Sequence, residues 1–223
     1  MDDQAVGWLG ALGLASAFAA TRSPARRGPA VALLGLLLLY MTVFAVVARV
    51  AAAAWAPVAA GAAVWLTLQP LVSLGRITPA ELGLVPPRAG SVRPAILITL
   101  LVLAANVAVM QVRGASSLDL GAGIVMAALL AAIIEEWVMR GALLALADRA
   151  SPPRWNLCGA PLGWGGMLVT AVFVALHGWR PGLLLGVLPA AVLYLWLRAR
   201  TGSLGPPIAA HLLWNLAVLL LHR

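Results

Sequence analysis

Residues 120–147 read LGAGIVMAALLAAIIEEWVMRGALLALA, and this stretch decides the class of protein. As a helix it is about 42 Å long, which is more than the roughly 30 Å hydrocarbon core of a bilayer. Glu135, Glu136 and Arg140 nevertheless lie inside it. An ionised side chain at the centre of a span costs about 2.5–3.5 kcal/mol on an insertion scale, so these residues are functional candidates.

The composition of the whole chain agrees with a membrane protein. Of 223 residues, 63% are hydrophobic and 10% are charged, whereas a soluble domain has about a quarter charged. The net charge of +8 comes entirely from Arg side chains that are scattered singly. A nucleic-acid partner is therefore not expected, because it would need a clustered basic face. The single cysteine, Cys158, excludes an intrachain disulfide framework.

Apolar runs predict an all-α fold, a polytopic membrane helix bundle of about eight transmembrane helices. Clusters of Gly, Pro and Arg separate the runs, and nothing divides residues 1–223 into more than one integral membrane domain. The predicted helices lie near 5–21, 29–48, 50–74, 94–112, 120–147, 164–179, 182–197 and 204–221. The boundary near Arg49 has the weakest signal, so seven spans are the alternative. The first run follows Asp2 and Asp3 rather than basic residues, which favours an anchor over a cleaved signal peptide.

The distribution of Arg predicts the orientation. With eight spans and both termini outside, ten Arg fall in cytoplasmic loops: Arg22, Arg26, Arg27, Arg76, Arg88, Arg93, Arg149, Arg154, Arg198 and Arg200. Four fall outside: Arg49, Arg113, Arg180 and Arg223. This asymmetry follows the positive-inside rule. A chain rich in Ala and Leu whose basic residues are all Arg suits a bacterium with GC-rich coding, so we expect the bacterial inner (cytoplasmic) membrane.

Polar residues in three separate apolar runs fall at similar depths. Glu135 and His177 each lie about 20 Å from the cytoplasmic end of their run, at 1.5 Å per residue. Asn215 lies about 15 Å and His211 about 9 Å from the start of the last run. A lone intramembrane His is most often a helix-to-helix hydrogen bond. Four such groups at comparable depth instead predict a polar cavity.

The residue types in this cavity suit amide hydrolysis. His211 and Asn215 are spaced i, i+4, so they share a helix face and offer two donors to an oxyanion. Glu135 beside His177 is a carboxylate base able to activate water. Glu136 and Arg140 are also spaced i, i+4 and pair as supporting residues. No cofactor is expected, because the HExxH arrangement of a zinc site is absent. A zinc ion bound by these side chains is the alternative.

Three motifs in order resemble the CPBP family of intramembrane proteases, also called the CAAX protease and bacteriocin-processing, or Abi, family. They are Glu-Glu-x-x-x-Arg (EEWVMR, 135–140), Phe-x-x-x-His (FVALH, 173–177) and His-x-x-x-Asn (HLLWN, 211–215). Each motif alone is weak, but three in order, each within an apolar run, are specific. The resemblance covers about 120–220, which would be the catalytic core; the first half resembles the family only in its membrane helices.

The resemblance implies a glutamic-type intramembrane endopeptidase. In the family pattern, Glu135 activates water with help from His177, and His211 and Asn215 stabilise the oxyanion. Phe173 belongs to the second motif as a supporting residue. The partners are then the lipid bilayer and a membrane-tethered protein or peptide, and a myxosortase-like sorting protease that removes C-terminal anchor tags is one form of this. The alternative is a non-catalytic membrane protein, such as a bacteriocin immunity or transport-associated protein.

Overall fold

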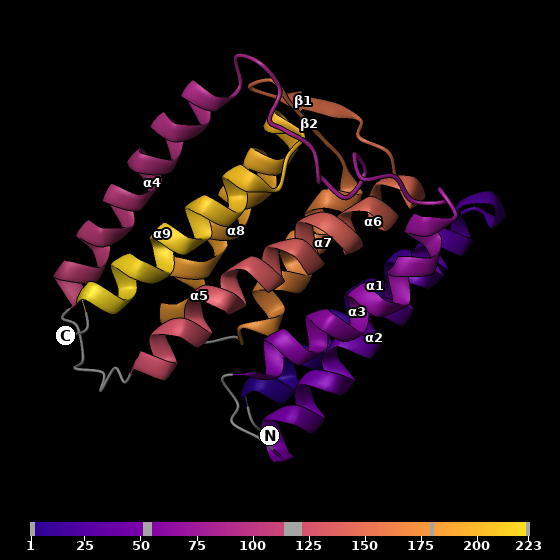
Figure 1. Ribbon diagram of the computed structural model, residues 1–223, viewed down its shortest axis with the longest axis horizontal. Coiled ribbons are helices and arrows are strands. Elements are labelled where there is room, and N and C mark those ends of the chain that lie inside the picture. The colour runs from indigo at the N-terminus through magenta and orange to yellow at the C-terminus, as the bar shows by residue number, and fades with distance from the viewer. Residues whose placement is uncertain (1–2, 51–54, 114–121, 179–180, 222–223) are drawn as a thin grey trace.

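The computed structural model describes residues 3–50, 55–113, 122–178 and 181–221 (Figure 1). Within these ranges the chain is all-α apart from one short hairpin, as predicted. The elements are α1 Asp3–Ala20, α2 Pro24–Val50, α3 Ala56–Ser73, α4 Val92–Arg113, α5 Ala122–Glu136, η2 Trp137–Leu143, α6 Leu144–Ala150, β1 Trp155–Leu157, β2 Ala160–Leu162, α7 Trp164–Leu176, α8 Pro181–Thr201 and α9 Gly205–Leu221. The predictions for Asp119, Arg180 and Arg223 concern residues outside the described ranges.

Three of these elements, α5, η2 and α6, are one continuous rod, so the described ranges contain eight helical rods and not seven. The weak boundary near Arg49 is real, because α2 ends at Val50 and α3 begins at Ala56. By length and apolarity, α2 and α3 qualify as candidate membrane spans within the described ranges. Shorter apolar helical stretches lie in α1, α4, α7 and α9.

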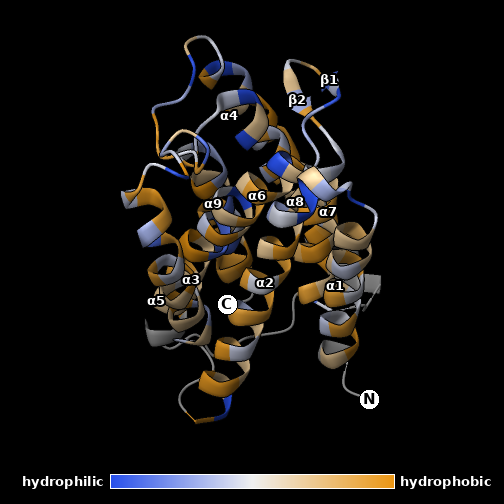
Figure 2. Cartoon of the chain, turned by 90° about the vertical axis from the view of Figure 1, so that its right-hand side faces the viewer, coloured by the Kyte–Doolittle hydropathy of each residue, from blue (hydrophilic) through white to orange (hydrophobic). Residues whose placement is uncertain are grey.

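The rods pack into two hydrophobic clusters. The larger one is formed by α1, α2 and α3 against η2, α6 and α7. The smaller one joins α4, α8 and α9 to the hairpin. Figure 2 shows hydrophobic residues along the helices, whereas hydrophilic residues concentrate at the end of the bundle that holds the hairpin and the start of α4. In Figure 1 both chain termini lie toward the opposite end, as an even number of rods requires.

Helix α7 is shorter than the apolar run that predicted it. It ends at Leu176, His177 is its C-cap, and Gly178 adopts a positive φ of 94° that closes the helix. Thirteen residues span about 20 Å, less than the hydrocarbon core of a bilayer. His177 therefore lies about 20 Å along the helix from its start at Trp164.

The segment between α6 and α7 was predicted as a loop and forms a hairpin instead. Strands β1 and β2 pair antiparallel, with Trp155 opposite Leu162. Cys158 and Gly159 form the two-residue turn, and both have positive φ, as the tight turns of hairpins require. Trp196 on α8 donates its indole N–H to the Leu157 carbonyl at 3.1 Å, which holds the hairpin on the bundle.

The segment between α3 and α4 is held to α6 by one ion pair. The Arg149 guanidinium donates to Glu81 Oε1 at 2.7 Å and to the Arg76 carbonyl at 2.6 Å. Desolvation would raise the pKa of Glu81, but hydrogen bonds from Thr78 and Arg149 outweigh it, so this pKa lies below its ordinary value. The ionised carboxylate therefore fixes this segment over the end of α6.

Close approach between α6 and α7 depends on a glycine, which gives a first prediction. A Cβ on Gly165 would lie 2.6 Å from the backbone oxygen of Ala147, so Gly165→Ala must separate the helices. We expect a loss of about 1–3 kcal/mol, typical of overpacking, measured as a lower thermal unfolding midpoint in detergent. Gly35→Ala on α2 is the matched control, because nothing lies within 4 Å of a Cβ there. Equal midpoints for the two variants would show that α6 and α7 are not in contact at this point.

Candidate functional site

The two glutamates lie where α5 changes from an α-helix to the π-helical turn η2. Glu136 is the last residue of α5 and the N-cap of η2, and Arg140 lies within η2. The π-helix is rare and is frequently found at functional sites. Residues 138–147 are all buried, so this part of the rod is surrounded by other helices. The unusual turn thus lies in the protein interior, beside the motif that the sequence singled out.

Glu136 and Arg140 form the predicted ion pair, and both are fully buried. Arg140 Nη1 donates to Glu136 Oε1 at 3.1 Å, with the two side chains 0–1% exposed. Arg140 Nη2 donates to the Ala191 carbonyl on α8 at 3.1 Å. The guanidinium carbon lies 4.3 Å from the Phe173 ring centroid and 5.4 Å from that of Tyr194. A buried charge is stable only with such partners, so Arg140 joins the rod to α7 and α8.

His211 on α9 makes a contact that the sequence did not predict. Its Nδ1 is 3.0 Å from Glu136 Oε1, the oxygen that also accepts from Arg140. Because an ionised carboxylate only accepts, His211 donates from Nδ1 and presents Nε2 on the other side of the ring. Glu136 therefore does more than neutralise Arg140. It also orients the His211 ring.

His177 is oriented by the end of its own helix. Its Nδ1 lies 2.8 Å from the Phe173 carbonyl oxygen, one turn back in α7. A carbonyl only accepts, so Nδ1 carries the proton and Nε2 of the neutral ring is the basic nitrogen. The Phe173 ring centroid lies 4.5 Å from the His177 ring and 6.1 Å from the His211 ring. Phe173 therefore lies between the two histidines and beneath the Arg140 guanidinium.

Asn215, one turn beyond His211 on α9, contacts helix α5. Its Nδ2 donates to the Ala128 carbonyl on α5 at 2.9 Å. The expectation that His211 and Asn215 aim both donors at one point is thus only partly met, since each uses one donor within the protein. His211 Nε2 and the second N–H of Asn215 remain for a substrate.

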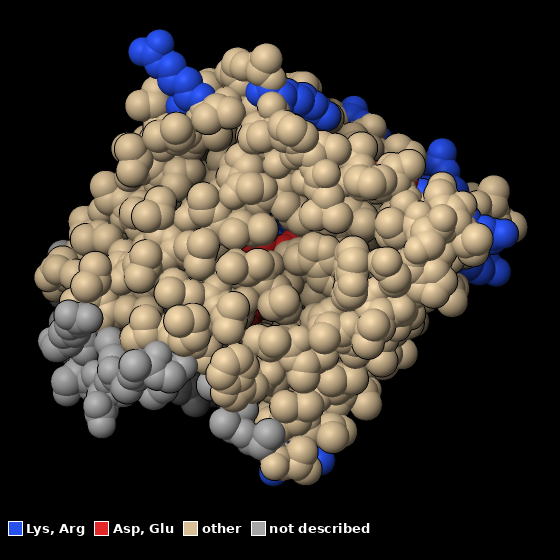
Figure 3. Space-filling model, in the orientation of Figure 1, with Lys and Arg blue, Asp and Glu red and all other residues tan. Residues whose placement is uncertain are grey.

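Glu135 differs from Glu136 in both burial and hydrogen bonding. It is half-buried, and its carboxylate makes no hydrogen bond to any other residue in the described ranges. It acts electrostatically on Tyr40 of α2 and on Tyr194 of α8. The predicted contact between Glu135 and His177 is not a direct hydrogen bond. Figure 3 shows a few acidic atoms, with basic atoms beside them, in a crevice near the middle of a face whose other Arg side chains lie at its edges.

Tyr194 is the site residue that the sequence missed. Its ring stacks on His211, with centroids 4.8 Å apart and planes at 20°, and it is 1% exposed. Its hydroxyl is one of several buried polar atoms without a hydrogen-bond partner in the described part of the chain, with Glu136 Oε2, Arg140 Nε, Ser151 Oγ and Thr170 Oγ1. The available signal was a hydroxyl in an apolar run, in a chain with two tyrosines.

Metal ligation was the alternative chemistry for these residues. Within the described ranges, no group of three or more His, Cys, Asp or Glu side chains is arranged to hold a metal ion. Cys158 lies in the hairpin turn and is exposed, away from the buried network.

Comparison with known proteins adds one finding. Residues 117–217 match the family model described as type II CAAX prenyl endopeptidase Rce1-like. No curated protein and no solved structure gives a significant match to the chain. The matched segment contains all three motifs, and it confirms the resemblance that those motifs carried.

Proposed function

We propose that this chain cleaves membrane-tethered proteins with water activated by Glu135. The premise is that residues 117–217 belong to the Rce1-like type II CAAX prenyl endopeptidase family of glutamic-type intramembrane proteases. Membership of this segment in the family implies an intramembrane protease, integral to the membrane, with protein substrates in the membrane. The proposal concerns which residues act and which kind of substrate is cleaved.

The observation that carries the proposal is the contrast between the two glutamates. Glu136 is fully buried and bonded to Arg140 and His211. Glu135 is half-buried without a hydrogen-bond partner among the described residues. A general base must be able to reach water, whereas a carboxylate that orients a histidine must be held. The two carboxylates thus suit two different tasks.

The chemistry follows from these positions. Glu135 removes a proton from water as the water oxygen attacks the carbonyl carbon of the scissile amide. His211, which Glu136 orients, and the second N–H of Asn215 donate to the oxyanion. The C–N bond then breaks, and the leaving nitrogen takes the proton that Glu135 accepted from water, while Nε2 of His177 accepts a hydrogen bond from the leaving group. Tyr194 and Phe173 fix the planes of the two imidazole rings.

The membrane arrangement is part of the same proposal. All eight rods cross the bilayer, residues 120–220 form the catalytic core, and the ten Arg of the predicted inner loops face the cytoplasm of a bacterium. Helices α1, α4, α7 and α9 have apolar stretches of 10–17 residues, which suit a locally thin bilayer around the site. Within the family, a sorting protease that removes a C-terminal anchor tag is the activity to test first.

A tethered substrate is expected to be cleaved at least tenfold faster than the same peptide without its anchor. A soluble peptide would have to expose its amides to lipid, at several kcal/mol per group, whereas an anchor raises the local concentration of the cleavage site. The measurement uses purified protein in liposomes with matched peptides, one carrying a C-terminal apolar helix and one lacking it. Equal rates would show that the anchor is not needed, although the protease assignment would stand. If the wild-type protein cleaves neither peptide, the non-catalytic alternative is favoured.

Activity is expected to survive removal of divalent metal ions. The roles assigned above use a carboxylate base and N–H donors, and the zinc pattern HExxH is absent from the sequence. The measurement compares cleavage before and after dialysis against a chelator, together with elemental analysis. Stoichiometric zinc, with activity lost to the chelator and restored by zinc, would replace the water-activating role of Glu135 by metal ligation.

A further inference from the structure

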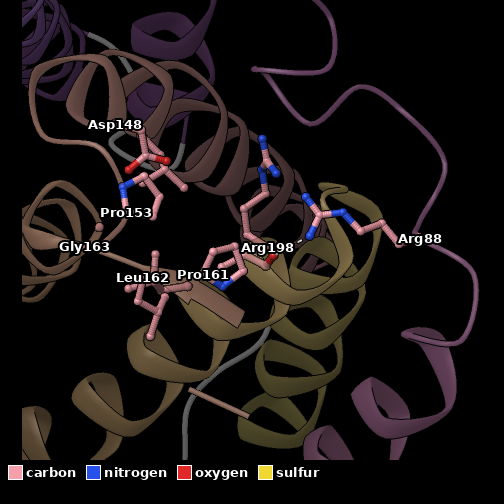
Figure 4. A pocket seen from close by; sticks show the side chains of 11 residues that line it. Arg88, Asp148, Pro153, Pro161, Leu162, Gly163 and Arg198 are labelled. Carbon is pink, nitrogen blue, oxygen red and sulfur yellow. Dashed lines mark hydrogen bonds between the residues drawn. The ribbon is translucent and has the colours of Figure 1, made fainter. Parts of the chain in front are cut away.

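A second polar cavity lies away from the site just described, at the end of the bundle that holds the hairpin. Its volume is about 180 Å³, several times the roughly 30 Å³ that one water occupies in the liquid. Residues of α6, α7, α8 and the hairpin form its walls, with Arg88 from the segment before α4. Figure 4 shows the Asp148 carboxylate on one side and the guanidinium groups of Arg198 and Arg88 on the other.

The charged groups of this cavity differ in how many hydrogen bonds they make to the protein. Arg198 is held by the protein, because Nε donates to the Arg140 carbonyl at 3.1 Å and Nη2 to the Glu81 carbonyl at 2.8 Å. Arg88 makes one long hydrogen bond, from Nη1 to the Ala199 carbonyl at 3.3 Å. The Asp148 carboxylate has no hydrogen-bond partner among the described residues. The cavity therefore offers N–H donors on one side and, on the other, a carboxylate that makes no hydrogen bond to the described residues and interacts with Arg198 by charge alone.

Three positions along the chain place this cavity at the level of the lipid headgroups. Asp148 directly follows the apolar run that ends at Ala147, Arg198 follows the run that ends at Leu197, and Arg88 precedes the run of α4. Each is thus at the boundary of a predicted span and on the predicted cytoplasmic side. Basic pockets at this level between membrane helices bind the phosphate groups of anionic lipid headgroups, so the phosphate of a phospholipid suits the two guanidinium groups.

We propose that this cavity binds the headgroup of an aminophospholipid, with the phosphodiester on Arg88 and Arg198 and the primary ammonium on Asp148. The charges are complementary, because the headgroup carries one negative and one positive group separated by a short linker. A purely anionic headgroup would leave Asp148 unpaired, and a quaternary ammonium has no N–H to donate to it. Leu144, Leu162 and Leu195 provide apolar walls for the linker.

The state of Asp148 is consistent with this ligand. Burial raises the pKa of Asp148 to about 6, and the nearby Arg198 charge opposes the shift. The carboxylate is therefore mostly ionised at neutral pH but poorly solvated, so an ammonium partner would compensate its desolvation. Arg198 also links this cavity to the Arg140 backbone in η2. Headgroup binding would thus stabilise the turn beside Glu136, whether or not the chain cleaves peptides.

The test compares thermal unfolding, followed by tryptophan fluorescence, in nanodiscs of phosphatidylcholine with and without added phosphatidylethanolamine or phosphatidylglycerol. We expect phosphatidylethanolamine to raise the midpoint of wild type by about 3 °C or more, and phosphatidylglycerol to raise it less. Arg88→Gln and Asp148→Asn should lose this difference. Arg93→Gln is the matched control, because Arg93 is exposed in the first turn of α4 and does not line the cavity.

Each comparison is made within one variant, so a change in its basal stability does not matter. Retention of the phosphatidylethanolamine effect in Asp148→Asn would overturn the ammonium contact. Equal protection by phosphatidylglycerol would reduce the site to general anion binding and overturn the proposal. If soluble glycerophosphoethanolamine alone reproduces the shift, the ligand is a free metabolite and the lipid assignment is wrong. The readout does not require proteolysis, so the failure of this inference is distinct from failure of the proposed function.

Discussion

Glu135→Gln is expected to abolish cleavage while the protein stays folded in the membrane. Gln keeps the shape of the side chain and removes its ability to accept a proton from water. General-base catalysis is worth about 10²–10⁴-fold, so kcat/KM should fall by at least about 10²-fold. Glu135 makes no hydrogen bond in the described part of the chain, so the unfolding midpoint should change little.

The measurement pairs cleavage of an anchored peptide with thermal unfolding of the same preparation. Glu81→Gln is the control for the chemical change, because Glu81 lies in the segment between α3 and α4 and pairs with Arg149 at partly exposed positions. Exposed pairs contribute about 1 kcal/mol or less, so this variant should keep its activity. Wild-type rates in folded Glu135→Gln would assign the base to another residue, with His211 and Glu136 as the next pair to test.

Glu136→Gln is expected to cost both stability and activity. It leaves Arg140 charged and buried without its carboxylate, and breaking a buried pair in this way costs about 3–5 kcal/mol. It also replaces the ionised carboxylate that accepts from His211 by an amide, which keeps one acceptor oxygen but has no negative charge. We expect a much lower unfolding midpoint and little cleavage, even at temperatures where the variant is folded.

A second substitution separates the two losses. In Glu136→Gln combined with Arg140→Met no charge is stranded, so most of the stability should return. Activity should not return, because His211 still lacks its carboxylate partner. A fully active double variant would make the Glu136–Arg140 pair purely structural. A Glu136→Gln variant as stable as wild type would show that the Arg140 contacts to Ala191, Phe173 and Tyr194 suffice.

The helices could be predicted from the sequence because lipid and protein interior both demand long apolar runs. The end of α7 was placed too late, because apolarity continues past Leu176 while the backbone turns at Gly178. The hairpin at β1 and β2 was missed because three-residue strands have too few positions to show alternation. The predicted cavity depth rested on straight helices, an assumption that η2 does not meet.

The candidate site was predicted as a set of residues but not as a set of bonds. The spacing of Glu136 and Arg140 identified their pair, since both lie on one helix face. The bond from His211 to the same carboxylate joins helices 75 positions apart, and nothing local in the sequence encodes it. Tyr194 was overlooked because one aromatic in an apolar run is ordinary; its importance arises from stacking on His211.

The π-helical turn has a consequence for how this rod tolerates change in length. Its hydrogen bonds reach five residues back rather than four. The turn therefore contains one more residue than an α-helical stretch of the same length along the axis. That extra residue is accommodated within the turn, so the glutamates keep their rotational phase relative to α6, which packs on α2 and α7. Deleting one residue from 137–143 would convert the turn into a regular helix at nearly the same phase, whereas deleting one residue from α5 or α6 would turn one half of the rod by about 100° relative to the other. Relatives of this chain should therefore tolerate the loss of one residue in η2 better than a deletion in the α-helical parts of the rod.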